Sequence, residues 1–261
     1  MTVAPAPTGT ARQLRTLRCG GENTLNSLFD PWDPNCGEIV YLPYRFWAVE
    51  HARGWVLIDS GPHPSLARDP ALRLGAQATL SDIREDGDDV VGRLGTIGVD
   101  ASAVTDVIAT HLHYDHCGGL ELLPQAAVHI QEAELAFAND PPVYQRSAYI
   151  PADWATVHEW AVHNGEHDLF DDGSIILIPT PGHTPGHQSV LIRLPEATFI
   201  CVADAAYHPQ KMTDRKLPGY LWNPDAIIDS WERLEQLQAQ TSATFLFSHH
   251  PGSEPRNSEV T

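Results

Sequence analysis

The sequence predicts an α/β (α+β) protein in which sheets are covered by helices. Short apolar strand patterns occur in runs, with amphipathic helical patterns between them, rather than in one strict strand–helix repeat. The chain has 261 residues, of which 42% are hydrophobic, and this is enough to bury a full core. No repeat or linker separates two cores. We therefore expect a single domain over residues 16–261, preceded by a disordered tail over residues 1–15.

Each predicted strand is a short run of β-branched, aromatic or aliphatic residues bounded by turn-forming residues. Residues 39–50 and 55–59 form one such pair, and the segment between them ends in Gly54, which suits a hairpin turn. Residues 189–193 and 198–202 form a second pair. The remaining predicted strands are residues 106–110, 124–130, 174–179 and 244–247.

Three segments have apolar residues at helical spacing. Residues 81–98 predict a helix whose apolar face carries Ile83, Val90, Val91 and Leu94. Residues 131–138 predict a short helix. Residues 224–240 have the clearest amphipathic pattern, formed by Ile227, Ile228, Trp231, Leu234 and Leu237.

Charge and composition exclude several classes of partner. The 34 acidic and 16 basic residues give a formal net charge of −18 at pH 7, which repels phosphate backbones and anionic headgroups. We therefore expect neither a nucleic acid nor a membrane as a partner. The four cysteines have no CxxC spacing, and the N-terminus has no apolar signal-peptide core. A soluble, cytoplasmic protein is the expectation.

Histidine is the unusual residue, with 14 in the chain, and the densest group follows the predicted strand 106–110. The segment Thr110-His-Leu-His-Tyr-Asp-His-Cys-Gly-Gly119 holds four polar side chains close together. One tight turn can direct His111 and His113 to one point, and Asp115 and His116 to another. Imidazole nitrogens with a carboxylate suit zinc, iron, cobalt or manganese rather than calcium.

Further candidate residues also follow predicted strands, where rigid scaffolds commonly hold active-site loops. His183 and His187 lie in a turn stiffened by Pro and Gly, and His187 is the weaker ligand candidate because it suits hydrogen bonding within the loop. Asp204 lies where a strand ends. His249 and His250 follow the last strand, and only one of them is expected to point inward, because adjacent strand residues face opposite sides.

The spacing His111-x-His113-x-Asp115-His116, followed by His183, Asp204 and His249, resembles the dinuclear site of the metallo-β-lactamase superfamily. Within it, Thr180-Pro-Gly-His-Thr-Pro-Gly-His-Gln-Ser189 and Asp204-Ala-Ala-Tyr207 resemble the N-acyl-homoserine lactonase branch. The resemblance extends over about residues 39–250. It implies an αββα sandwich, with two mixed β-sheets flanked by helices and the metals at one edge of the sheets.

The resemblance also implies a role for each residue. One metal would be held by His111, His113 and His183, and the other by Asp115, His116 and His249, with Asp204 bridging the two. The expected cofactors are therefore two divalent metal ions, zinc first, with iron, cobalt and manganese as alternatives. A hydroxide between the metals would be the nucleophile. Asp115 would accept its proton, and Tyr207 would polarise the substrate carbonyl or protonate the leaving alkoxide.

Two segments depart from the lactonase pattern, residues 20–37 and residues 140–166, and we expect them to line the substrate pocket. A largely apolar substrate would enter beside aromatic side chains, for which the candidates are Phe29, Trp32, Phe46 and Trp47. The pair His249-His250 also departs, because relatives commonly have a single His followed by Asp. We expect His249 to be the ligand.

The expected function is hydrolysis of a lactone ring, above all that of an N-acyl homoserine lactone, which is quorum quenching. Two alternatives stay open: hydrolysis of another small lactone such as 4-pyridoxolactone, and an iron-dependent sulfur dioxygenase reaction on the same fold. The expected partner is a small-molecule lactone, and the chain is expected to be a monomer or homodimer.

Overall fold

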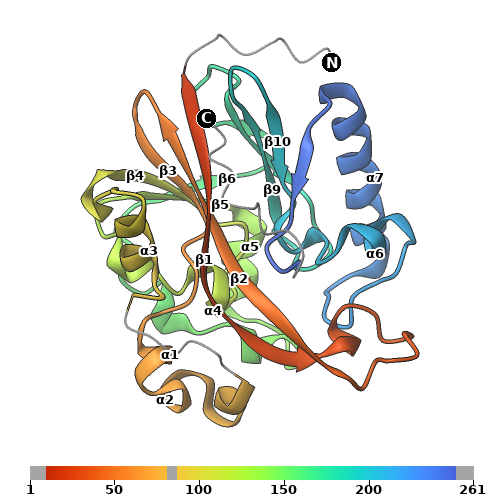
Figure 1. Ribbon diagram of the computed structural model, residues 1–261. Coiled ribbons are helices and arrows are strands. Elements are labelled where there is room, and N and C mark those ends of the chain that lie inside the picture. Colours follow the sequence, from red (N-terminus) through yellow and green to blue (C-terminus); the bar gives the residue numbers. More distant parts are fainter. Residues whose placement is uncertain (1–9, 81–86, 251–261) are drawn as a thin grey trace.

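Figure 1 shows the computed structural model, which describes residues 10–80 and 87–250. Its strands form two mixed sheets. The first sheet has six strands in the order in which they occur in the chain, namely β1 (Ala11–Leu25), β2 (Ile39–His51), β3 (Gly54–Ile58), β4 (Val104–Ile108), β5 (Ala127–Gln131) and β6 (Trp160–His163). Strands β1 to β3 pair antiparallel, and β3 to β6 pair parallel.

The second sheet has five strands in the order β11-β10-β9-β8-β7. Pairing is antiparallel from β7 to β10 and parallel between β10 and β11. The strands are β7 (His167–Asp168), β8 (Ile175–Pro179), β9 (Gln188–Arg193), β10 (Thr198–Cys201) and β11 (Thr244–Leu246).

Helices cover the outer faces of both sheets (Figure 1). The α-helices are α1 (Ser65–Arg68), α2 (Pro70–Leu74), α3 (Val90–Thr96), α4 (Tyr114–Cys117), α5 (Glu132–Asn139), α6 (Pro209–Thr213) and α7 (Pro224–Thr241). Short 3₁₀ turns occupy Asn26–Leu28, Gly75–Leu80, Ala101–Ala103, Leu120–Leu122, Arg146–Ala148, Pro151–Asp153 and Ala203–Ala205. None of the helices in the described residues is long and apolar enough to cross a membrane.

The buried apolar residues form three groups that define the layers. One group lies between the sheets and joins residues such as Trp47 and Ile58 to Leu177 and Val190. A second packs the first sheet against α3, α5 and neighbouring segments, and a third packs the second sheet against α7. From one side of the molecule to the other, the layers are helices, first sheet, second sheet and helices. This confirms the predicted two mixed sheets flanked by helices.

The long helix α7 shows why these residues form a helix at this place. Asn223 caps its first turn by accepting hydrogen bonds from the backbone N–H groups of Asp225 and Ala226. The apolar face buries Ile227, Trp231 and Leu234 against the second sheet. Each such side chain contributes about 1.5–3 kcal/mol of hydrophobic stabilisation.

Several sequence predictions need correction. Strand β1 begins at Ala11, so residues 11–15, expected in the disordered tail, are paired with β2 instead. Of the helix expected over residues 81–98, the described part is helical only over α3, which begins at Val90, where Asp89 caps it, and Val91 is exposed. Ile83 lies outside the described residues. Strands β6 and β7 were not predicted, because they are short and half-exposed and carry little apolar pattern.

Candidate metal centre

The first part of the site is the loop between β4 and α4. Asp59 holds the start of this loop, because its carboxylate accepts hydrogen bonds from the backbone N–H and the hydroxyl of Thr110, at 2.8 and 3.0 Å. After α4, the chain passes close to other backbone segments at Gly118 and Gly119. A side chain at Gly118 would meet the backbone nitrogen of His63 at 2.3 Å, so only glycine fits this path. This close backbone packing fixes the position of the histidines that precede Gly118 in the chain.

The second part is the loop between β8 and β9, which carries His183. Gly182 adopts φ +143° and packs against α7, where a Cβ would lie 2.5 Å from the Cα of Ile227. The backbone N–H of Trp222 donates to the carbonyl oxygens of Gly182 and His183, at 2.9 and 3.0 Å. The second sheet and α7 together therefore aim His183 at the first loop.

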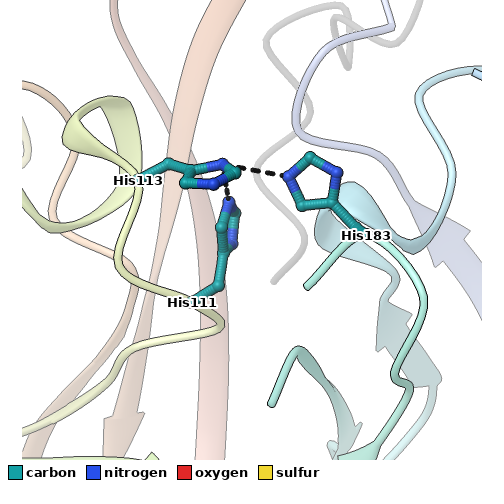
Figure 2. Close-up of side chains that lie close together, drawn as sticks. All are labelled: His111, His113 and His183. Carbon is teal, nitrogen blue, oxygen red and sulfur yellow. Dashed lines mark hydrogen bonds between the residues drawn. The ribbon is translucent and has the colours of Figure 1, made fainter. Parts of the chain in front are cut away.

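Three buried imidazoles meet at one point, as Figure 2 shows. The Nδ1 atom of His113 lies 3.0 Å from Nε2 of His111 and 3.0 Å from Nε2 of His183. Burial lowers the pKa of all three rings, well below the ordinary value for His111 and His113. Neutral imidazoles carry a lone pair on one ring nitrogen, so the three rings can act together as metal ligands.

A second group lies beside the first. The Nε2 atoms of His116 and His249 lie 3.2 Å apart, and each is 3.5 Å from Oδ2 of Asp115. This group also contains two imidazoles and one carboxylate, and its ligand atoms lie within 4.8 Å of one another.

Asp204 lies between the two groups. Its Oδ1 atom is 3.0 Å from His249 Nε2 and 3.3 Å from His116 Nε2, and its Oδ2 atom is 3.4 Å from His183 Nε2. Burial alone would raise the pKa of this carboxyl, but His249 and His116 hold its pKa well below the usual range. An ionised carboxylate with one oxygen toward each group is the geometry of a bridging ligand.

Most of the remaining ring nitrogens are held by the protein, as is usual for metal-binding histidines. The exception is His113 Nε2, which is buried without a hydrogen bond to any described residue. His116 Nδ1 lies 2.7 Å from Asp59 Oδ2, and His249 Nδ1 lies 2.8 Å from the carbonyl oxygen of Pro43. His187 has no nitrogen left for a metal, because its Nε2 accepts from the Asp204 backbone N–H at 3.1 Å and its Nδ1 faces the Thr180 hydroxyl at 2.9 Å. His187 therefore orients the loop.

The donor set fits two divalent transition-metal ions. All seven residues expected as ligands lie in these overlapping groups. Asp204 Oδ1 is buried without a hydrogen bond from any described residue, although two imidazole nitrogens face it. Nitrogen and carboxylate donors clustered in this way are the ligand types that zinc, iron, cobalt and manganese accept.

The two adjacent histidines at the end of β11 lie in different places. His249 is 1% exposed and belongs to the second group. His250 is half-buried, its ring lies 4.3 Å from the ring of His208, and it is neither in the groups nor in the cavity lining. The chain therefore presents only His249 to the site.

A cavity of about 220 Å³ opens over both groups. Residues 20–37 supply Glu22, Thr24 and Leu28 to its wall, and residues 140–166 supply Ser147 and Ala148, as expected for the two unmatched segments. The other lining residues are Leu42, His113, Tyr114, Asp115, His183, Asp204, Tyr207, Tyr220 and His249.

The prediction that Phe29, Trp32, Phe46 and Trp47 line the substrate pocket is wrong, because none of them lines the cavity. Phe46 and Trp47 are buried on opposite faces of β2, one toward the helices and one between the sheets. Trp32 is 89% exposed and does not line the cavity. Phe29 supports Tyr207 instead, with the two rings edge to face at 5.8 Å.

Tyr207 lines the cavity, and its hydroxyl lies 3.4 Å from His183 Nδ1. Burial raises the pKa of this phenol well above its ordinary value, so it keeps its proton at neutral pH. Sequence reasoning missed Glu22, Tyr114 and Tyr220. Tyr114 lies inside the histidine motif, which was a usable signal, whereas Glu22 and Tyr220 come from segments without a motif.

Comparisons with known proteins identify the family and the fold. The model of the metallo-beta-lactamase superfamily matches residues 44–249. The N-acyl homoserine lactonase AttM of Azorhizobium caulinodans is 30% identical over 222 residues, which is 82% of this chain and 84% of that protein. The lactonase AiiA of Bacillus thuringiensis subsp. kurstaki is 24% identical and covers 87% of each chain.

Solved structures share the fold. The structure of an N-acyl homoserine lactone hydrolase with the product N-hexanoyl-L-homoserine at its catalytic metal centre superposes with a TM-score of 0.80, at 23% identity, over 93% of this chain and 95% of that one. The dizinc quorum-quenching lactonase AidC superposes with a TM-score of 0.70, at 18% identity, over 97% and 93%. From the match over residues 44–249 and the shared architecture, the chain belongs to the metallo-beta-lactamase superfamily.

Proposed function

We propose that this protein is a metal-dependent hydrolase that opens the lactone ring of N-acyl homoserine lactones, and so acts in quorum quenching. The observation that carries the proposal is the bridging position of Asp204 between two His-containing groups at the floor of a cavity. Relatives named N-acyl homoserine lactonase, similar over more than four-fifths of the chain, support the choice of substrate.

The proposed ligands follow from the two groups. His111, His113 and His183 would hold one divalent ion, and Asp115, His116 and His249 would hold the other. Asp204 would bridge them, and zinc is the first choice of metal, with iron, cobalt and manganese as alternatives. Two bound cations would supply hydroxide at neutral pH and stabilise negative charge on the carbonyl oxygen.

The chain's own residues then bind the lactone and move protons. Asp115 lies at the cavity floor as a carboxylate, because His116 and His249 offset the effect of burial and lower its pKa. It accepts the proton of the attacking water. Tyr207 stays protonated and donates a hydrogen bond to an oxygen of the lactone, either the carbonyl or the ring oxygen that leaves as an alkoxide. Leu28 and Leu42 provide apolar wall for the acyl chain.

We further propose that the protein works in the cytoplasm as a monomer or homodimer. All four cysteines are free thiols, which suits a reducing compartment.

A comparison of substrates tests this function. Protein loaded with zinc should open N-acyl homoserine lactones of several chain lengths faster than 4-pyridoxolactone, and chelation should abolish the reaction. Preference for 4-pyridoxolactone would reassign the substrate. One equivalent of iron with oxygen consumption on a persulfide would reassign the protein to the dioxygenases.

A further inference from the structure

Glu22 is the one acidic side chain of the cavity wall that is not among the seven proposed metal ligands. It lies in β1, just after an irregularity in the pairing with β2. Between Arg18 and Gly21, β1 advances by three residues, while β2 advances by two, from Arg45 to Pro43. One residue is therefore inserted, which makes a β-bulge.

Two glycines make this bulge and set the direction of Glu22. Gly20 has φ +86°, which glycine adopts without strain. A Cβ at Gly21 would lie 2.5 Å from the carbonyl oxygen of Leu42 and 2.5 Å from the Tyr41 hydroxyl, so no other residue fits. Bulges next to active sites commonly redirect a side chain. Here the result is a carboxylate on the cavity wall beside Asp115 and His249.

Two tyrosines fix one oxygen of this carboxylate. The hydroxyls of Tyr44 and Tyr114 each donate to Glu22 Oε2 at 2.9 Å, and the two hydroxyl oxygens lie 3.1 Å apart. The tyrosine rings pack edge to face at 6.3 Å, which holds both phenols in place. No described residue donates a hydrogen bond to the other oxygen, Oε1. Glu22 is therefore a rigid acceptor with one oxygen unused.

The surroundings act on the charge of Glu22 in both directions. Burial and the neighbouring Asp115 raise its pKa above the ordinary value, and the hydrogen bonds from Tyr114 and Tyr44 oppose this shift. Cations bound at the adjacent groups would favour the charged form further, because a bound metal dominates the local field. A partly buried carboxylate oxygen without a hydrogen bond costs free energy, so a substrate that supplies a donor to it binds more tightly.

We propose that Glu22 Oε1 accepts a hydrogen bond from an N–H group on the ring carbon next to the lactone carbonyl, and so selects amide-bearing lactones over lactones without this donor. The inference rests on the proposed lactonase function and deepens it. An N-acyl homoserine lactone carries such an N–H two bonds from the carbonyl carbon that is attacked. Glu22 is then a specificity-determining residue that does not act on the reacting bond.

The test uses two substrates that differ only at this donor. One is N-hexanoyl homoserine lactone, and the other is the hexanoyloxy lactone, in which an ester oxygen replaces the N–H. Hydrogen bonds to charged groups predict that the zinc-loaded wild-type protein opens the amide with a kcat/KM about 10- to 100-fold higher. Glu22→Gln should remove most of this preference by lowering kcat/KM for the amide much more than for the ester.

Glu38→Gln is the matched control, because it makes the same substitution at an exposed position of the neighbouring segment. It should leave the preference unchanged. The metal content and the thermal midpoint of each variant show whether a change in selectivity comes from altered folding. The preference of the wild-type protein is measured without any variant. Equal rates on both substrates in the wild type, or equal losses on both in Glu22→Gln, would overturn the inference alone. Wild-type protein that opens neither lactone would overturn the proposed function as well.

Discussion

The buried carboxylate of Glu134 accepts a hydrogen bond from the backbone N–H of Leu112 at 3.0 Å and another from the hydroxyl of Thr184. Leu112 lies between His111 and His113, and Thr184 follows His183. One side chain of α5 therefore joins the two loops whose imidazoles meet at the first group. Because the loops come from different sheets, this link fixes the distance between ligands that are far apart in the sequence.

Replacing Glu134 should weaken metal binding without touching a ligand. Its Oε1 accepts from Leu112 and from the Tyr149 hydroxyl, and its Oε2 accepts from Thr184. In Glu134→Gln, one of these positions becomes an NH₂ group that faces donors. We expect an affinity for zinc about 10- to 100-fold lower, measured by competition with a chelating dye.

Glu132→Gln is the control, because Glu132 is an exposed residue of the same helix. It should bind zinc as tightly as the wild type. Unchanged affinity in Glu134→Gln would show that the two loops hold their positions without this carboxylate.

Tyr207→Phe should slow catalysis and keep the metals. The phenol is protonated and lies on the cavity wall, so its loss removes one donor to a charged oxygen in the transition state. We expect kcat to fall by about 10- to 1,000-fold on the substrate that is turned over fastest. Metal analysis should still give about two ions per chain. Loss of metal would instead make Tyr207 a ligand, and an unchanged kcat would make it a packing residue.

The adjacent residues His249 and His250 provide a matched pair of substitutions. His249→Ala removes a ring that lies 3.0 Å from Asp204 and should lose metal and nearly all activity. His250→Ala removes a ring that packs on His208 and Phe247 and should lose much less. Elemental analysis and kcat for both variants decide the matter, and the opposite ranking would mean that the ligand had been assigned to the wrong residue.

A histidine outside the site should make stability depend on pH. His163 of β6 stacks on His167 of β7 at 4.0 Å, and its Nε2 lies 3.0 Å from His129 Nδ1. Burial and these two neighbours lower the pKa of His163 to about 4 from an ordinary 6.5. Between these pH values the unfolded chain binds more protons than the folded one. The free energy of unfolding therefore falls as pH falls through this window.

His163→Gln should remove this contribution, so its free energy of unfolding should fall less steeply than that of the wild type between pH 6.5 and 4. Urea unfolding at a series of pH values measures the difference. His158→Gln, at an exposed histidine, should run parallel to the wild type. If the free energy of unfolding of His163→Gln falls with pH as steeply as that of the wild type, the packing of His163 against His167 and His129 does not lower its pKa.

The residues that gather in the two groups could be predicted from the sequence because the relevant information is local. Each proposed ligand lies in the short segment that follows an apolar strand, and strand ends at one edge of a sheet lie close together. The residues between the motifs could not be placed in the same way. Glu22 meets Tyr114 only because β1 pairs with β2 around the Gly20–Gly21 bulge, and no periodic pattern marks that bulge.

The aromatic residues of β2 show a second limit. Phe46 and Trp47 are adjacent, and both are buried because the sheet is covered on both faces. In such a strand the apolar run is continuous, so it gives no sign of which face each residue takes or of whether it lines a cavity. The prediction of one helix over residues 81–98 was wrong for a different reason. Asp89 caps α3 and starts it late, inside a pattern that had suggested one continuous helix.

The most direct test of the central claim is the identity of the product formed from N-hexanoyl homoserine lactone in water enriched in heavy oxygen. We expect a single product, N-hexanoyl homoserine, with one heavy oxygen in its new carboxylate, formed by the zinc-loaded protein and not after chelation. Mass spectrometry of the fragmented product locates the label. Release of hexanoic acid, or a ring-opened product with the label in its alcohol, would contradict attack at the lactone carbonyl.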